Sequence, residues 1–514
     1  MLLALCVSLQ AAVHEHDSSP DWRALAEHSQ GMVGAWSCGA SNCHGGERHE
    51  LVPPQRSGGE LEIYRSRDPH GRAGELLETE RFADILLRLK IAEKLPQTAS
   101  RGYRVLDQVR LQECMNCHNP ADMENRWSPE TGARSTSLTF AIECETCHGS
   151  AQHWIASHAR PGWNRMAATL QGFQDTKNLL VRGRACSQCH VGDANHDMNH
   201  DMIAAGHPPL RFELASYVAK LPKHWHDRKA RTLTPHLELQ LWLAGQIANF
   251  DSSLTLLESR KQRSREVNDN RTPGELASVL IGNRPTTSWP EFAEYSCTGC
   301  HQAITSSANW SAAKQRQTPR ETPLAWASWN QGFMDSLLLQ RTTPAPAQQQ
   351  LLANYAALQR EMETGSLGTE TSSGDFSRTI HQFRFGSPAA LGFHAFGSRL
   401  MHDMPATAPP AGFTPHPLGA LGLQQPLPAN WNGERAAHAY AFLVATVQSQ
   451  YDEEAKLHLP RQVPAELRES LRQMKQRLTP LPNRPFGAEA NVWHEDFTKP
   501  LSRAAQLVEG ARQP

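Results

Sequence analysis

The sequence has almost no net charge. It contains 51 Lys and Arg against 52 Asp and Glu, for a formal net charge of −1. Nucleic-acid-binding domains usually carry a basic excess, so this balance argues against a nucleic-acid partner. The chain also lacks any run of about 18 apolar residues, the length that indicates a membrane-spanning helix. We therefore expect no transmembrane segment.

A disordered chain is also excluded by composition. Apolar residues make up 39% of the chain, and glycine and proline number 34 each among 514 residues, close to the composition of globular proteins. At about 150 residues per domain, the length suggests roughly two to four domains. The 11 cysteines and 25 histidines are the counts that need an explanation.

Ten of the cysteines form five close pairs, and a histidine follows each pair at once. Four pairs have the spacing Cys-x-x-Cys-His, for which chance predicts roughly 0.01 match per chain of this composition. The first pair has four intervening residues. The five motifs are Cys38, Cys43 and His44; Cys114, Cys117 and His118; Cys144, Cys147 and His148; Cys186, Cys189 and His190; and Cys297, Cys300 and His301.

This spacing is typical of covalent haem c attachment. Two thiols separated by a tight turn can reach the two vinyl groups of one porphyrin, and the adjacent histidine then binds the iron as the proximal ligand. In the first motif Gly39, Ala40 and Ser41 are small enough for a bulged loop that does the same. The sequence therefore predicts five haem c groups.

Zinc binding and disulfide formation are the alternatives to haem attachment for these cysteines. Zinc also binds paired cysteines and histidine, but it needs four ligands and no histidine directly after every pair. For Cys38 and Cys43, a disulfide or a free pair is the alternative. If all five pairs hold haem, only Cys6 is left, and no disulfide can form within the chain.

The remaining histidines supply candidate distal iron ligands. His70 lies in Asp-Pro-His, His153 follows the third motif, and His200 and His207 follow the fourth. His158 and His196 are weaker candidates. The alternative for each is an ordinary surface or capping histidine, and nearby methionines are minor alternative ligands.

The order of these motifs resembles exported multihaem cytochromes of the cytochrome c-552/c-554 group, over about residues 37–212. The resemblance rests on Asp-Pro-His70, Cys-Met-Asn-Cys-His118, Glu-Cys-Glu-Thr-Cys-His148-Gly and Ala-Gly-His207-Pro. It implies bis-histidine haems in closely stacked pairs, with distal roles for His70, His153 and His207. The chain departs from the group in its first motif and at Gln302. The related nitrite reductases use Cys-x-x-Cys-Lys, which does not occur here.

We expect a mainly α fold with extensive irregular loops and few or no strands, organised by its haems. Residues 1–13 resemble an export signal with a truncated start, the alternative being a buried N-terminal segment. Residues 14–301 form the pentahaem region, and 302–514 a Cys-free, mostly helical region with linkers at 364–377 and 404–428. Hydrophobic periodicity predicts helices at the following positions: 73–94, 237–258, 345–361, 433–457 and 465–478.

These features favour an exported pentahaem electron carrier that works outside the cytoplasm, for example in the periplasm, with a redox partner protein. Haems with two histidine ligands leave no open iron site, so they can only pass electrons. The alternative is an oxidoreductase that acts on nitrite, hydroxylamine or sulfite at one five-coordinate haem, for which the haems of His118 and His301 are candidates. A third possibility is a subunit that docks to a membrane-associated respiratory complex.

Overall fold

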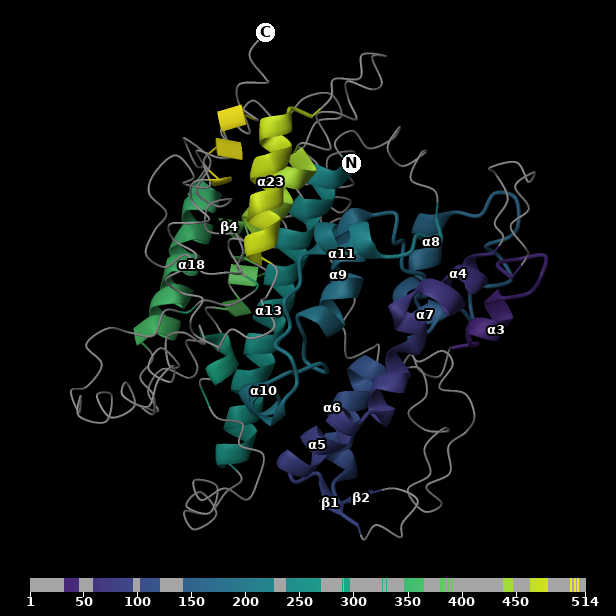
Figure 1. The fold of residues 1–514 in the computed structure, drawn as a ribbon, viewed down its shortest axis with the longest axis horizontal. Helices are drawn as coiled ribbons and strands as arrows, with labels where there is room; N and C mark the ends of the chain where they lie inside the picture. Colours follow the sequence, from purple (N-terminus) through teal and green to yellow (C-terminus); the bar gives the residue numbers. More distant parts are fainter. Residues whose placement is uncertain are drawn as a thin grey trace, which may run out of the picture. The chain divides into compact units, whose positions relative to one another are not determined.

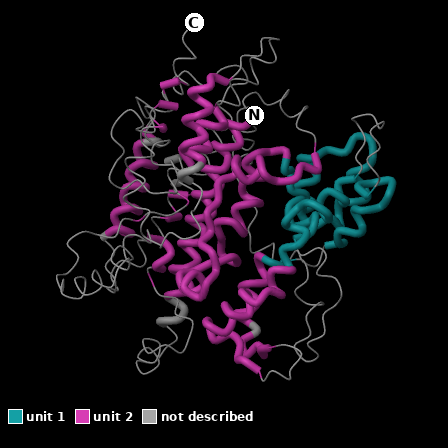
Figure 2. The backbone as a smooth tube through the Cα atoms, viewed as in Figure 1, with its two compact units in different colours: residues 1–74, 118–176 teal, residues 75–117, 177–514 magenta. Residues whose placement is uncertain are grey.

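The computed structural model describes residues 32–45, 59–95, 102–120, 142–225, 237–269, 346–364, 438–446 and 463–478. It also describes short runs and single residues near 289–295, 326–330, 380–391 and 500–507. The chain divides into two compact units (Figure 2). Unit 1 comprises residues 1–74 and 118–176, and unit 2 comprises residues 75–117 and 177–514.

Unit 1 consists of short helices joined by irregular segments. These helices are α3 (Ala35–Cys38), α4 (Glu60–Arg67), α7 (Cys144–His148) and α8 (Arg165–Thr169) (Figure 1). Tyr64 of α4 is buried beside Ala35 of α3. Its hydroxyl donates a hydrogen bond to the carbonyl of Ile142, just before α7. These contacts connect three elements that are distant in sequence.

The single helix predicted at 73–94 is only partly right. The chain forms a 3-10 helix η2 (Pro69–Glu78), helix α5 (Glu80–Arg88) and strand β1 (Ala92–Lys94). Thr79 starts the second helix, because its hydroxyl accepts a hydrogen bond from the Phe82 amide at 3.2 Å. Lys90 has a φ of 57°, a left-handed conformation that ends α5 and turns the chain back.

Strand β1 is part of a small antiparallel hairpin in unit 2. It pairs with β2 (Tyr103–Val105), with Ala92 opposite Val105. Helix α6 (Gln108–His118) follows the hairpin. A second antiparallel hairpin lies further along the chain and consists of the two-residue strands β3 (Gly386–Ser387) and β4 (Ala390–Leu391).

A long helix, α13 (Leu237–Asp269), is the central element of unit 2. It extends beyond the predicted range 237–258. Helix α9 (Leu179–His190) packs against it closely, because Gly183 has no side chain at the crossing. A Cβ atom at Gly183 would lie 2.9 Å from the Cβ of Ala248. The short helices α10 (His200–Ala205) and α11 (Leu214–Lys220) belong to the same unit.

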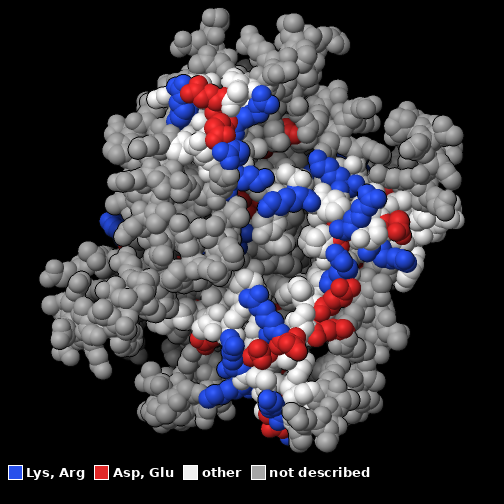
Figure 3. Space-filling view, in the orientation of Figure 1, with Lys and Arg blue, Asp and Glu red and all other residues white. Residues whose placement is uncertain are grey.

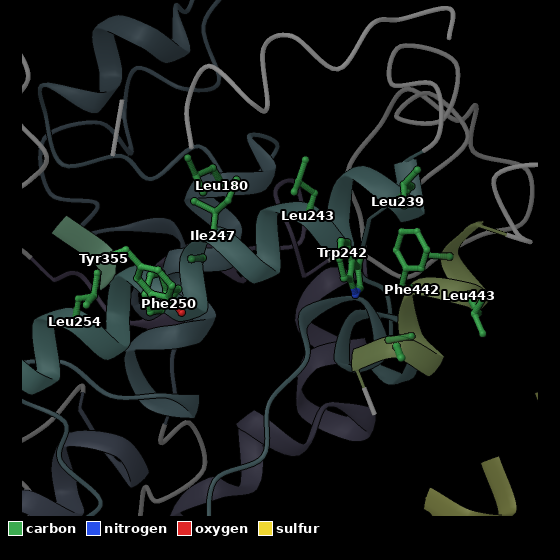
Figure 4. Packing of buried hydrophobic residues seen from close by; sticks show 14 of the residues in the cluster. Leu180, Leu239, Trp242, Leu243, Ile247, Phe250, Leu254, Tyr355, Phe442 and Leu443 are labelled. Atoms are coloured by element: carbon green, nitrogen blue, oxygen red, sulfur yellow. The ribbon is translucent and has the colours of Figure 1, made fainter. Parts of the chain in front are cut away.

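The C-terminal region shares its hydrophobic core with α13 (Figure 4). Trp242 of α13 meets Phe442 with ring centroids 4.8 Å apart, and Phe250 meets Tyr355 at 5.8 Å. Tyr355 lies on α18 (Pro346–Thr364), and α23 (Ala465–Leu478) contributes further core residues. Burial of these large aromatic rings joins residues after 302 to the haem-motif region.

The predicted helices at 345–361 and 465–478 agree with α18 and α23, and residues 438–446 of the helix predicted at 433–457 are helical. The linkers at 364–377 and 404–428 lie outside the described residues, apart from Thr364 at the end of α18. The described fold is mainly helical, with strands only in two short hairpins, which confirms the predicted fold class.

Charged groups are paired both inside unit 2 and on the surface. Arg260 is 6% exposed and lies 2.6 Å from Asp197 and 2.5 Å from Glu294. On the described surface in Figure 3, basic and acidic side chains lie side by side. Arg104 and Glu93 form an exposed ion pair. None of the helices in the described ranges is both long and apolar enough to cross a membrane.

Candidate functional site

Three of the cysteine motifs lie on the last turns of helices. Helix α6 ends at His118, α9 ends at His190, and α7 consists of the third motif itself. Residues three and four positions apart lie on the same face of a helix. Both thiols and the following imidazole of each motif therefore share one side, as attachment to one porphyrin requires.

The first motif forms the bulged loop that its longer spacing predicts. The His44 amide donates to the carbonyl of Cys38 at 3.2 Å, and the Cys43 amide donates to that of Ala40 at 2.8 Å. A Cβ atom at Gly39 would lie only 2.3 Å from a methyl carbon of Leu61. The loop therefore lies close against α4, and a side chain at Gly39 would displace that of Leu61.

The first and third motifs meet in unit 1, where the thiols of Cys38 and Cys144 lie within hydrogen-bonding contact. The contact lowers the pKa of Cys38, and together with burial it raises that of Cys144 well above its usual range. These are properties of free thiols, which haem attachment converts to thioethers. The contact brings two attachment points together across about 100 residues of sequence.

Two buried carboxylates on either side of Cys144 hold this arrangement. Glu145 accepts hydrogen bonds from the amides of Val33 at 3.0 Å, Gly34 at 2.8 Å and Ala151 at 2.7 Å. Glu143 accepts one from the Ala35 amide at 3.1 Å. Carboxylate–amide bonds are stronger than neutral ones. They attach the segment before Cys38 directly to the third motif.

The second and fourth motifs meet in the same way in unit 2. The ligand atoms of Cys117, Cys189 and His196 all lie within 4.8 Å of one another. Nδ1 of His196 is 2.7 Å from Asp193. Burial alone would lower the pKa of His196, but hydrogen bonds with Asp193 and Cys189 outweigh it and raise the pKa to about 10. His196 also lies 3.2 Å from the carbonyl of Asn116.

This cluster is also the arrangement among the described residues that most resembles a metal site. Structural zinc has four ligands, whereas this cluster offers three. Its two cysteines come from different Cys-x-x-Cys-His motifs, so a shared zinc ion would leave Cys114 and Cys186 without a role. The geometry fits two neighbouring haem attachment points better than one zinc centre.

Aromatic side chains surround the proximal histidine of the fourth motif. The ring of His190 stacks on Phe212 with centroids 4.9 Å apart and meets the edge of Tyr217 at 5.2 Å. Burial raises the pKa of the Tyr217 hydroxyl, which donates to the carbonyl of Arg211 at 2.7 Å. An apolar wall of this kind suits one side of a haem pocket.

Two candidate distal histidines are held through one ring nitrogen. Nδ1 of His70 lies 2.8 Å from the buried carboxylate of Asp68. Nδ1 of His207 lies 2.7 Å from the carbonyl of Pro208, and burial lowers the pKa of this imidazole. Iron-binding histidines are usually oriented by such a contact at the second nitrogen. Both residues therefore have the support that a ligand needs.

The other predicted site residues differ in their surroundings. The side chain of His153 is exposed and forms no hydrogen bond or ring contact with the described part of the chain. His200 is the first residue of α10, and its backbone amide donates a hydrogen bond to the carboxylate of Glu291 at 2.9 Å. The imidazole ring of His200 packs edge-on with the ring of Phe292. The fifth motif, Cys297, Cys300 and His301, lies outside the described residues.

His158 gains an importance that the sequence did not suggest. Its ring lies nearly parallel to that of His44, with centroids 6.2 Å apart and planes 12° apart. Trp154 and Trp163 meet the edges of the same imidazole at 5.5 and 6.3 Å. Sequence reasoning treated it as a weak candidate because no motif surrounds it. The flanking tryptophans are the signal that could have identified it.

The surroundings of His44 and His158 fit a haem. Two polar atoms there, the indole nitrogens of Trp154 and Trp163, are buried N–H donors without a hydrogen-bond partner. A buried unsatisfied donor is costly and calls for a ligand or water. Haem propionates would accept such bonds, and the apolar rings would cover the porphyrin. Bound haem would supply a one-electron iron couple at this place.

The comparisons with known proteins agree with this geometry. Residues 63–149, which contain His70 and the second and third motifs, match the family model described as cytochrome c554 and c-prime. This match is narrower than the stretch 37–212 over which the sequence resembles the group. No curated protein and no solved structure matches the chain. Residues 63–149 therefore form a domain of the cytochrome c554 and c-prime family, which is a family of multihaem c-type cytochromes.

Proposed function

We propose that this multihaem cytochrome is an exported pentahaem electron carrier. It holds haem c at all five cysteine motifs, and most of its irons have two histidine ligands. Electrons enter from one redox protein, pass between neighbouring haems and leave to another, in a respiratory chain. Membership of the family already implies electron transfer and redox partners. The number of haems, their ligands and their route are the parts we propose.

The observation that carries this proposal is the pairing of motifs. Cys38 of the first motif contacts Cys144 of the third, and Cys117 of the second lies beside Cys189 of the fourth. Porphyrins attached to neighbouring sulfurs lie close to each other. Close spacing is what electron transfer between haems requires, whereas a set of isolated binding sites would not need it.

Two further points support an exported electron carrier with histidine-ligated haems. Cytochromes c of this family are typically extracytoplasmic, and we propose the periplasm for this chain. His70, His158 and His207 each have Nδ1 within hydrogen-bonding distance of an oxygen, which suits axial ligation through the other nitrogen. We expect its partners to be redox proteins, with docking to a membrane-associated complex as one form.

The test is a haem count combined with an electron paramagnetic resonance spectrum. The full chain, matured with haem, should show a mass increase of five haems and only low-spin ferric signals, and it should be reduced in several steps. A variant with Cys297→Ser and Cys300→Ser should contain one haem fewer. A count of four in the parent chain would contradict the pentahaem proposal.

The same spectrum separates the carrier from the enzyme alternative. A high-spin signal near one equivalent would show an open iron and refute a purely electron-carrying role. Reduction of nitrite or sulfite, or turnover of hydroxylamine, would then be measured with the same preparation. The expected result is no turnover of the three compounds above that of free haem.

A further inference from the structure

We propose that His158 is the distal ligand of the haem attached to Cys38 and Cys43, opposite His44. This assignment rests on the proposed function, because it requires haem at the first motif. It differs from the expectation drawn from the family resemblance, in which His153 is the distal ligand that follows the third motif. The two histidines belong to the same stretch after α7, so the assignment can be tested directly.

The separation of the two imidazoles carries the assignment. Their ring centroids lie 6.2 Å apart, and their planes differ by 12°. Because a metal–imidazole bond is about 2 Å long and the ring centre lies roughly 1 Å beyond the nitrogen, two imidazoles on one metal have ring centres about 6 Å apart. The observed separation is therefore the one that a single iron between them requires. Two rings in direct contact would lie closer together.

Each imidazole has an oxygen beside Nδ1. In His44 this atom lies 3.6 Å from the carboxylate of Glu60, an ion-pair distance that is longer than a hydrogen bond. In His158 it lies 2.5 Å from the carbonyl of Ile155, one turn earlier. Orientation through one ring nitrogen fixes the tautomer and leaves the other nitrogen, Nε2, as the metal ligand. His158 thus carries the hydrogen bond typical of an axial histidine, and Glu60 lies beside the corresponding nitrogen of His44.

Aromatic packing fixes the position of His158 on its remaining sides. Trp154 and Trp163 meet its ring edge-on, and Phe173 packs against both tryptophans at 5.1 and 5.0 Å. The indole N–H groups of both tryptophans are buried without a partner, as expected if they donate to a group of the haem. His153, by contrast, is exposed and has no such support.

The experiment compares His158→Ala with the matched control His153→Ala in the haem-loaded full chain. Covalent attachment keeps the haem in place, so mass spectrometry should show an unchanged haem count in both variants. We expect His158→Ala to convert about one haem equivalent from low spin to high spin by electron paramagnetic resonance. We expect His153→Ala to keep that haem in the low-spin state. Added imidazole should return the His158→Ala protein to low spin, because it can bind the vacated axial position.

A second comparison identifies the haem. In a background with Cys38→Ser and Cys43→Ser, which lacks the first haem, His158→Ala should produce no new high-spin signal. A signal that persists there would assign His158 to another haem and overturn the proposal. A low-spin spectrum for His158→Ala in the parent chain would also overturn it. If the parent chain carried no haem at the first motif, the proposed function itself would fail, and the mass would reveal this separately.

Discussion

Replacement of Glu145 is the sharpest test of how the first and third motifs are held together. Its carboxylate is buried and accepts hydrogen bonds from three backbone amides, those of Val33, Gly34 and Ala151. Glutamine has nearly the same shape but only one acceptor oxygen, and its amide group points hydrogens at the remaining donors. Glu145→Gln therefore removes charge and acceptors without leaving a cavity.

The magnitude follows from those bonds. A hydrogen bond to a charged group contributes about 1.5–3 kcal/mol. The substitution removes at least one such bond and weakens the others, while the segment around Val33 is only partly buried. We expect a loss of about 3 kcal/mol in the free energy of opening this region, which corresponds to a roughly 100-fold change in an equilibrium constant.

Hydrogen exchange measures that opening locally. In the haem-loaded chain, peptides that contain Val33, Gly34 or Ala151 should exchange roughly 100-fold faster in Glu145→Gln. The matched control is Glu62→Gln, on an exposed position of α4 in the same unit. Peptides from unit 2 should keep the rates of the parent chain.

Two results would refute the reasoning. Equal exchange rates in Glu145→Gln and Glu62→Gln would mean that the carboxylate does not hold the segment before Cys38. A uniform increase over both units would mean that the substitution unfolds the protein as a whole. The lost negative charge should also raise the reduction potential of the haems nearby, because a carboxylate stabilises the more positive ferric state.

Three further predictions concern unit 2 and the second motif. Arg260→Ala removes the charged partner of the buried Glu294, whereas Asp197 keeps its ion pair with Arg263. Chemical denaturation should show a loss of about 3–5 kcal/mol in the free energy of unfolding, against less than about 1 kcal/mol for the exposed control Arg104→Ala. Gly183→Val inserts a side chain where α9 meets α13 and should lower the free energy of unfolding by about 1–3 kcal/mol or more. Gly102→Ala has open space around it and should not lower the free energy of unfolding by this amount. His118→Ala should lose or disorder its own haem, and an unchanged haem content and spectrum would show that the second motif does not bind haem as inferred.

The haem chemistry was predictable from sequence because each attachment motif is local. Two thiols and an imidazole within five residues can attach one porphyrin wherever the segment lies in the fold. The amphipathic helices α18 and α23 were predictable for the same reason, since a 3.6-residue period needs no knowledge of the partner surface. The helix predicted at 73–94 is interrupted because the side chain of Thr79 caps a new helix and Lys90 adopts a left-handed backbone conformation.

The arrangement of the motifs was decided only by tertiary structure. Contacts of Cys38 with Cys144, and of Cys117 with Cys189, join residues far apart in sequence, and no pattern of spacing encodes them. The same applies to His158, whose value as a ligand depends on the ring of His44, more than a hundred residues earlier. Sequence alone therefore predicted haem c binding and the five motifs for its attachment. Long-range packing determined which motifs are neighbours and which imidazoles lie close together, because both depend on distances that only the folded chain defines.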